Sequence, residues 1–232
     1  MKRITSPETR RDLLRAPAAG LVAAFAAAAG AEFATPARAG AQTELTPDAA
    51  LKELLAGNQR FMRGRMTALD VDLKILKRKT ADQQKPFAAV LSCADSRVPV
   101  EFIFDQSIGQ IFVCRVAGNV ITSEIIASLE YGAAVLGTKA IVVLGHANCG
   151  AVKAAMQGKA APGQISTLYR YFQPALDQAG SNLELAIKSN AKIQSELLRK
   201  GSTVVADLVK KNLIKVTAAY YDIALGGVTL LE

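Results

Sequence analysis

The sequence predicts an α/β protein with a mostly parallel central sheet of four to five strands flanked by helices. Short, continuous apolar runs recur along the chain, as expected for parallel strands that are buried on both faces. Helical patterns separate these runs, which is the alternation typical of a parallel α/β sheet. Half of the 232 residues are hydrophobic, so the chain can form one domain with a substantial core.

The predicted strands are three apolar runs and one later segment. The runs are bounded by polar residues or glycine, and the later segment alternates β-branched and aromatic residues. They cover residues 86–91, 111–116, 140–144 and 214–225.

The predicted helices have apolar residues at helical spacing. The first begins with Thr46 as its N-cap and Pro47 at its first position. This helix precedes the strand–helix alternation, and its apolar face has to pack against another surface. The helices cover residues 47–63, 69–79, 120–136, 150–157, 165–178, 182–200 and 202–211.

Residues 1–41 have the composition of an export signal. Arg10 and Arg11 precede an apolar stretch at 21–29, and Ala37-Arg38-Ala39 offers small residues at a cleavage site. The paired arginines are typical of a twin-arginine signal. We expect cleavage, a periplasmic or secreted domain at 42–232, and no stable membrane span afterwards, because the apolar stretch is short. An uncleaved anchor or an alanine-rich tail is the alternative.

The net charge of +8 comes partly from this signal. In the rest of the chain, the basic residues are spread over helical faces, and no basic patch with interleaved aromatic residues occurs. This pattern is typical of solvent-exposed helix faces, so we do not expect the protein to bind nucleic acid.

Cys93, His146 and Cys149 form the candidate metal site. Cys93 follows the first predicted strand, and the other two follow the third, at strand ends where chemistry is located in α/β sheets. Two thiolates and an imidazole are a known catalytic zinc set with an open fourth position. Cys114 lies inside an apolar run and is expected to be a small buried residue. A Cys93–Cys149 disulfide is the alternative in an oxidising compartment.

Four stretches resemble the β-class carbonic anhydrase family. They are residues 93–98, 104–119, 128–131 and 145–150, and the likeness extends over about 47–230. The resemblance implies one zinc ion per chain, held by Cys93, His146 and Cys149, with Asp95 and Arg97 as the catalytic dyad. It also implies a homodimer or homotetramer in which the N-terminal helices pack on a partner subunit.

The same resemblance implies a substrate pocket made of five residues, some supplied by the partner chain. They are Gln84, Phe112, Ala117, Tyr131 and Gly150. The chain has no tryptophan, so the bicarbonate pocket that some members build with this residue is absent in its usual form.

The implied activity is reversible hydration of carbon dioxide to bicarbonate and a proton, by a hydroxide that zinc generates. One alternative is hydrolysis of carbon disulfide or carbonyl sulfide on the same scaffold. Another is a non-catalytic zinc- or bicarbonate-binding protein, against which the Asp95–Arg97 pair argues. A thiol redox protein is disfavoured because no Cys-x-x-Cys occurs.

Overall fold

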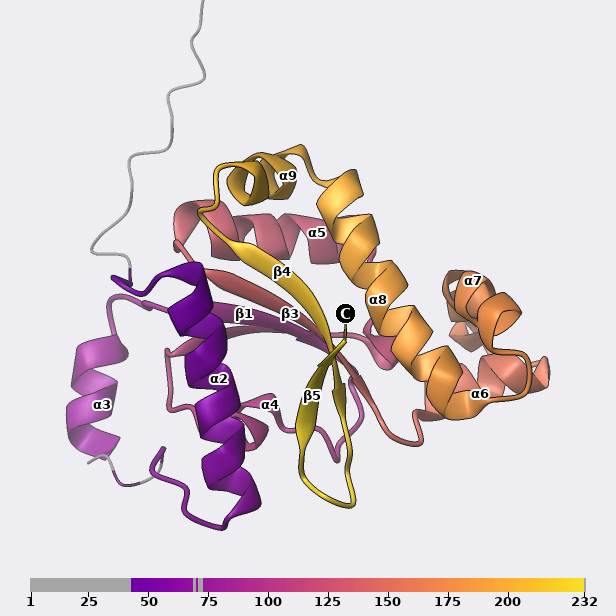
Figure 1. The fold of residues 1–232 in the computed structure, drawn as a ribbon, viewed down its shortest axis with the longest axis horizontal. Helices are drawn as coiled ribbons and strands as arrows, with labels where there is room; N and C mark the ends of the chain where they lie inside the picture. Colours follow the sequence, from indigo (N-terminus) through magenta and orange to yellow (C-terminus); the bar gives the residue numbers. More distant parts are fainter. Residues whose placement is uncertain (1–42, 69, 71–72, 232) are drawn as a thin grey trace, which may run out of the picture. The chain divides into compact units, whose positions relative to one another are not determined.

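A single sheet of five strands is the centre of the computed structural model, which describes residues 43–68, 70 and 73–231 (Figure 1). Its strand order is β2-β1-β3-β4-β5. The strands are β1 (Ala88–Ser92), β2 (Ile111–Arg115), β3 (Ala140–His146), β4 (Lys215–Tyr221) and β5 (Val228–Leu231). The first four run parallel, and β5 pairs antiparallel with β4, so the predicted fold class is confirmed. The expected export signal lies outside the described residues.

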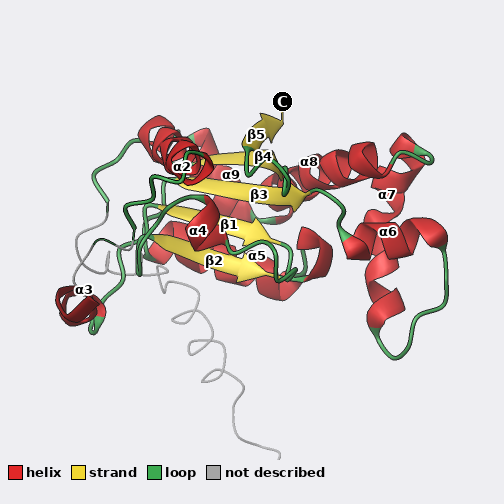
Figure 2. Cartoon of the chain, turned by 90° about the horizontal axis from the view of Figure 1, so that it is seen from below, coloured by secondary structure: helices red, strands yellow, loops and turns green. Residues whose placement is uncertain are grey.

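The register aligns the carboxyl ends of the parallel strands. Ser92 pairs with Arg115 on one side and with Leu144 on the other, so Cys93 and His146 follow neighbouring strands at the same edge. In Figure 2 the arrowheads of β1, β2 and β3 all point toward the side where α6 and α7 lie. The candidate metal ligands are therefore at this edge.

Alternate residues of the buried strands face two separate layers of helices. Val90 and Val142 pack in one cluster with residues of α2 and α4. Leu91 and Val143 pack in a second cluster with residues of α5, α8 and α9. This two-sided burial explains why the strands are continuous apolar runs rather than alternating ones.

Apart from the short α4, which the sequence did not predict, the helices follow the predicted order. Thr46 caps the first one, and its hydroxyl accepts a hydrogen bond from the N–H of Ala49 at 3.2 Å. None of the described helices combines the length and apolar composition that a membrane span needs. The helices are α2 (Pro47–Met62), α3 (Leu73–Thr80), α4 (Val100–Ile103), α5 (Ser123–Glu130), α6 (Gly150–Gln157), α7 (Tyr169–Ala179), α8 (Leu183–Gly201) and α9 (Thr203–Lys210).

Three predicted elements differ from the structure. The helix expected at 120–136 starts at Ser123 and changes to a π-helix over Tyr131–Val135. The helix expected at 165–178 begins with a 3₁₀ turn before α7. The last strand, expected at 214–225, ends at Tyr221, and a turn at 222–227 leads into β5. Two glycines in this turn let the chain reverse.

Candidate metal centre

Cys93 and His146 are placed by the ends of the two central strands. Cys93 is the residue after β1, and His146 is the last residue of β3. A short turn then leads to Cys149, which caps the start of α6, and Asn148 takes up the left-handed φ of 53° that this turn requires. All three predicted ligands are buried.

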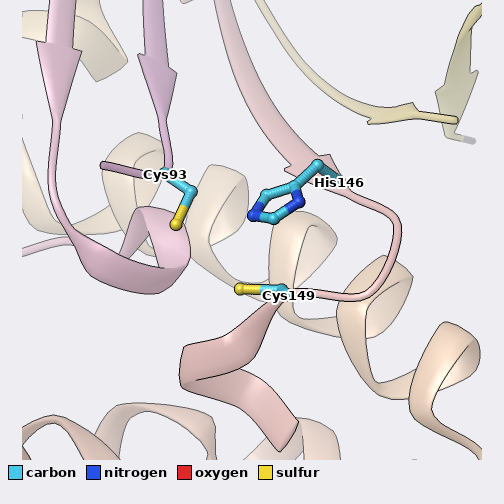
Figure 3. A group of neighbouring side chains, drawn as sticks. All are labelled: Cys93, His146 and Cys149. Carbon is cyan, nitrogen blue, oxygen red and sulfur yellow. The ribbon is translucent and has the colours of Figure 1, made fainter. Parts of the chain in front are cut away.

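The three ligand atoms face a common space. The two sulfur atoms and an imidazole nitrogen lie within 4.8 Å of one another, and Figure 3 shows the three side chains pointing together. All three cysteines of the sequence are free thiols, so the alternative Cys93–Cys149 disulfide does not form in this structure. Cys114 lies away from this group in β2, where burial raises the pKa of its thiol, as expected for a small core residue.

The two thiols of the cluster influence each other strongly. Contact with the Cys149 thiol lowers the pKa of Cys93, and the hydrogen bond from the Gly118 N–H at 3.2 Å acts in the same direction, against the effect of burial. The same contact and burial raise the pKa of Cys149. The two thiols thus oppose each other's ionisation, and a divalent cation would be the counter-charge that lets both ionise.

The imidazole of His146 has one nitrogen bound and one free. Its Nδ1 lies 3.0 Å from the carbonyl oxygen of Ala147, and its buried Nε2 has no hydrogen-bond partner among the described residues. An Nδ1–H donated to this carbonyl leaves Nε2 unprotonated, which is the tautomer a metal ion binds. A buried polar atom without a partner is rare, so this nitrogen fits a metal ligand.

Asp95 and Arg97 form a bidentate pair on the loop after Cys93. The guanidinium donates from Nε to Oδ1 at 2.9 Å and from Nη2 to Oδ2 at 2.7 Å. These bonds hold the pKa of the Asp95 carboxyl well below its usual range. Asp95 Oδ2 also lies 3.9 Å from His146 Nε2, so the carboxylate borders the space between the three ligands.

A family model described as "Carbonic anhydrase" matches residues 88–228, which span β1 to β4 and all three candidate ligands. The chain belongs to the β-carbonic anhydrase family. The Mycobacterium tuberculosis (strain CDC 1551 / Oshkosh) protein "Carbonic anhydrase 2" is 49% identical over 112 residues, which are 47% of this chain and 53% of that protein. The Mycolicibacterium smegmatis carbonic anhydrase is 41% identical over 135 residues, covering 56% and 65% of the two chains. The chain thus spans between about half and two thirds of these relatives.

Solved carbonic anhydrases of the β class share the fold. A chain from the tetrameric β-carbonic anhydrases of the ascomycete Sordaria macrospora superimposes with a TM-score of 0.62 at 23% identity. The match covers 68% of this chain and 87% of that one. At this identity the likeness confirms the arrangement of sheet and helices.

Arg115 is a residue beside the candidate metal ligands for which the sequence analysis predicted no role. It ends β2, and its guanidinium donates to the Cys93 carbonyl at 3.0 Å and to the Asp95 carbonyl at 2.5 Å. It therefore holds the backbone of the loop that carries both Cys93 and Asp95. A charged residue at the end of an otherwise apolar run was the available signal.

The five predicted pocket residues fall into two groups. Ala117 begins the turn whose Gly118 contacts Cys93, and Gly150 is the first residue of α6, directly after Cys149. The other three lie toward the amino ends of the strands.

Phe112 pairs with Ala89, which lies four residues before Cys93. At a strand rise of about 3.3 Å per residue, Ala89 and its partner are roughly 13 Å from Cys93 along the strand. The Phe112 and Tyr131 rings are neighbours, with centroids 6.4 Å apart. Gln84 lies four residues before the start of β1 and is exposed. Within one chain, the structure does not bring these three residues to the metal ligands.

Proposed function

We propose that this chain catalyses the reversible hydration of carbon dioxide to bicarbonate and a proton, with one zinc ion per chain. Cys93, His146 and Cys149 would hold the ion. The observation that supports this most is the cluster itself, in which three buried ligand atoms meet and His146 Nε2 has no other partner. Membership of the carbonic anhydrase family gives this cluster its chemical context.

Zinc in such a site would lower the pKa of a water ligand to about 7 and so supply a nucleophile at neutral pH. Carbon dioxide is apolar, and its hydration adds the oxygen of water to carbon and releases one proton. The chain must therefore orient the attacking oxygen and let the proton leave.

Asp95 is the group that would orient the attacking oxygen. As a carboxylate it accepts hydrogen bonds and donates none. It can therefore accept a hydrogen bond from the attacking water and so direct a lone pair of the water oxygen toward carbon. Arg97 keeps Asp95 ionised through its two hydrogen bonds. Arg97 also donates to the Asn148 carbonyl at 3.3 Å, which ties the Cys93 loop to the loop between His146 and Cys149.

The proton has to leave without a second imidazole, because His146 is the only histidine in the sequence. Water and buffer molecules are the acceptors available at the exposed side of Arg97. Turnover at high rates should therefore depend on buffer concentration.

Stopped-flow measurement of CO2 hydration, with zinc quantified on the same sample, tests this function. We expect one zinc per chain and activity that disappears with a chelator and returns with zinc. Stoichiometric zinc without CO2 hydration would refute the proposal, and assays of carbon disulfide and carbonyl sulfide hydrolysis on that sample would then separate a related hydrolase from a binding protein.

We also propose that two copies of the chain form a dimer. Gln84, Phe112 and Tyr131 can line a pocket with the metal ligands only if a second chain brings them there. The face of α2 that contains Leu54 is covered by the sheet of its own chain. A partner subunit would therefore have to contact a surface other than this face.

We propose that a second copy covers the surface between α3 and α4. A cavity of about 440 Å³ opens there, and its apolar lining includes exposed Leu73, Phe102 and Ile108. Apolar side chains grouped in this way on a surface are typical of an interaction site.

Light scattering of Phe102→Asp tests the dimer, with Leu197→Asp as a control at a similarly exposed leucine of α8. We expect Phe102→Asp to be monomeric, to keep zinc because one chain holds all three ligands, and to lose CO2 hydration. Leu197→Asp should remain dimeric and active. An active wild-type monomer would contradict the proposal.

A further inference from the structure

Two buried amide side chains on α8 are not explained by core packing. Asn190 and Gln194 are 1% and 0% exposed, one helical turn apart, although asparagine and glutamine are mostly found at protein surfaces. They lie on the face of α8 that packs against the sheet and α7. Buried amides have to be satisfied by hydrogen bonds. Gln194 Nε2 donates one to the Tyr171 carbonyl of α7 at 3.3 Å, and the others lead to the turn beside the metal centre.

The hydrogen bonds form a continuous chain from α8 to a metal-ligand sulfur. Gln194 Nε2 donates to Asn190 Oδ1 at 3.1 Å, and Asn190 Nδ2 donates to the Gly118 carbonyl at 2.9 Å. The N–H of the same Gly118 donates to Cys93 Sγ at 3.2 Å. Neither amide touches the three ligands, but both are linked to one of them through a single residue.

A second bond ties the same turn to α8. Gln194 Oε1 accepts from the N–H of Ile121 at 2.7 Å. With Oε1 engaged in this way, the donor side of the Gln194 amide faces Asn190 Oδ1. The Asn190 amide is then oriented with its NH2 group toward Gly118. The pair thus fastens the turn at two points three residues apart.

Gly118 needs this support because its conformation is unfavourable for most residues. Its φ is 72°, and Asn119 follows with a φ of 48°. The Phe172 ring of α7 lies so close that a Cβ on residue 118 would be 2.3 Å from its Cζ atom. Two successive left-handed residues pressed against a ring keep one orientation only where neighbouring groups hold them.

We propose that Asn190 and Gln194 are positioning residues of the metal centre. By fixing the carbonyl of Gly118, they aim its N–H at Cys93 Sγ, which holds the sulfur in place and tunes its donation of charge to the ion. Partners of this kind around a metal ligand typically change metal affinity by about 10- to 100-fold. This inference rests on the proposed zinc site and adds two of its determinants on a distant helix.

Zinc affinity and the spectrum of the cobalt(II)-substituted protein test the proposal on the full chain. The thiolate-to-cobalt charge-transfer band reports the sulfur ligands directly, so a loss of general packing does not imitate its change. The variants are Asn190→Leu, Asn190→Ala and Gln194→Met. Ser195→Ala is the matched control, because Ser195 is buried on the same helix and its hydroxyl donates to the Lys192 carbonyl of α8 itself.

We expect Asn190→Leu to weaken zinc binding, measured by chelator competition, about tenfold or more and to alter the charge-transfer band. Gln194→Met should have a smaller effect of the same kind, because it removes the bond to Ile121 and the orientation of Asn190 but leaves Asn190 able to bond the Gly118 carbonyl. Ser195→Ala should stay within about twofold of the wild type. If Asn190→Leu does not fold, Asn190→Ala, which leaves room for a water molecule, decides the question by the same measurements.

Unchanged zinc affinity and cobalt spectrum in the folded Asn190 variants would overturn the positioning role and leave the proposed function intact. An equal loss in Ser195→Ala would overturn it as well, since the effect would then belong to the packing of α8. A wild-type chain that binds no zinc would overturn the proposed function together with this inference.

Discussion

The Asp95–Arg97 pair and the Asp105–Arg60 pair join the same two chemical groups in different surroundings. The Asp105 side chain is 0% exposed, and its oxygens accept from Arg60, from the backbone and hydroxyl of Thr67, and from the N–H of Ala68. The Asp95 side chain is 17% exposed, and Arg97 supplies each of its hydrogen bonds among the described residues.

The difference lies in what each carboxylate has left to offer. A carboxylate has about four lone-pair positions, and the donors around Asp105 use them all. Asp95 Oδ2 has one donor and still borders the space between Cys93, His146 and Cys149. A saturated carboxylate holds a fold together, whereas one that keeps a free position beside a metal site is available for chemistry.

The largest expected effect tests whether a metal ion occupies the space that Asp95 borders. Cys149→Ser should lose its zinc, because a neutral hydroxyl replaces one of two thiolates. Cys114→Ser should keep one zinc per chain, since Cys114 lies in β2 away from the cluster. Metal analysis after dialysis compares the two, and equal losses would remove the assignment of ligands.

The next effect tests the free position of Asp95. Asp95→Asn should keep zinc and lower the rate of CO2 hydration at least about 100-fold, because the amide NH2 no longer accepts the hydrogen of the attacking water. Asp105→Asn should hydrate CO2 at nearly the wild-type rate in the folded protein. Full activity of Asp95→Asn with zinc bound would show that the pair is only an ion pair on the loop.

Asp95 could be predicted from the sequence, whereas the Asn190–Gln194 pair on α8 could not. Three metal ligands and the dyad lie within short motifs at strand ends, where local pattern and fold coincide. Asn190 and Gln194 carry no motif. Their positions continue the stripe of Ile187, Ala191 and Leu198 on α8, so helical periodicity placed two amides on the buried face. Only the tertiary structure shows that their partners are Gly118 and Ile121.

Strand positions could be predicted because a sheet buried on both faces needs continuous apolar runs. The turn at 222–227 could not be separated from the last strand, since its Ile223 and Leu225 continue the apolar pattern. The π-helix over Tyr131–Val135 was also hidden, because its residues suit an α-helix equally well. Its extra residue depends on where α5 meets the next strand, which is a tertiary property.

A smaller effect, on stability instead of turnover, tests the saturated pair. Asp105→Asn should lower the free energy of unfolding by about 2 to 3 kcal/mol, because one donor facing the new NH2 group loses its partner in a buried place. Asparagine suits the left-handed φ of 47° at this position, so backbone strain adds little. Urea unfolding of the metal-free protein measures the change, and an unchanged midpoint would contradict the structural role.

The smallest effect is the dependence of stability on acid. Burial alone would raise the pKa of Asp105, but hydrogen bonds from Arg60, Ala68 and Thr67 outweigh it and lower the pKa. A carboxyl group whose pKa is lower in the folded than in the unfolded chain stabilises the fold above the unfolded value, near 3.9, and that stability is lost as the pH falls through the folded value. One such group changes the free energy of unfolding by at most about 1.4 kcal/mol per pH unit.

The metal-free wild type should therefore lose stability more steeply than Asp105→Asn as the pH falls from 5 toward 2.5, as measured by urea unfolding at each pH. Parallel curves for the two proteins would mean that Asp105 does not stay ionised against Arg60, and the contrast with Asp95 would then rest on exposure alone.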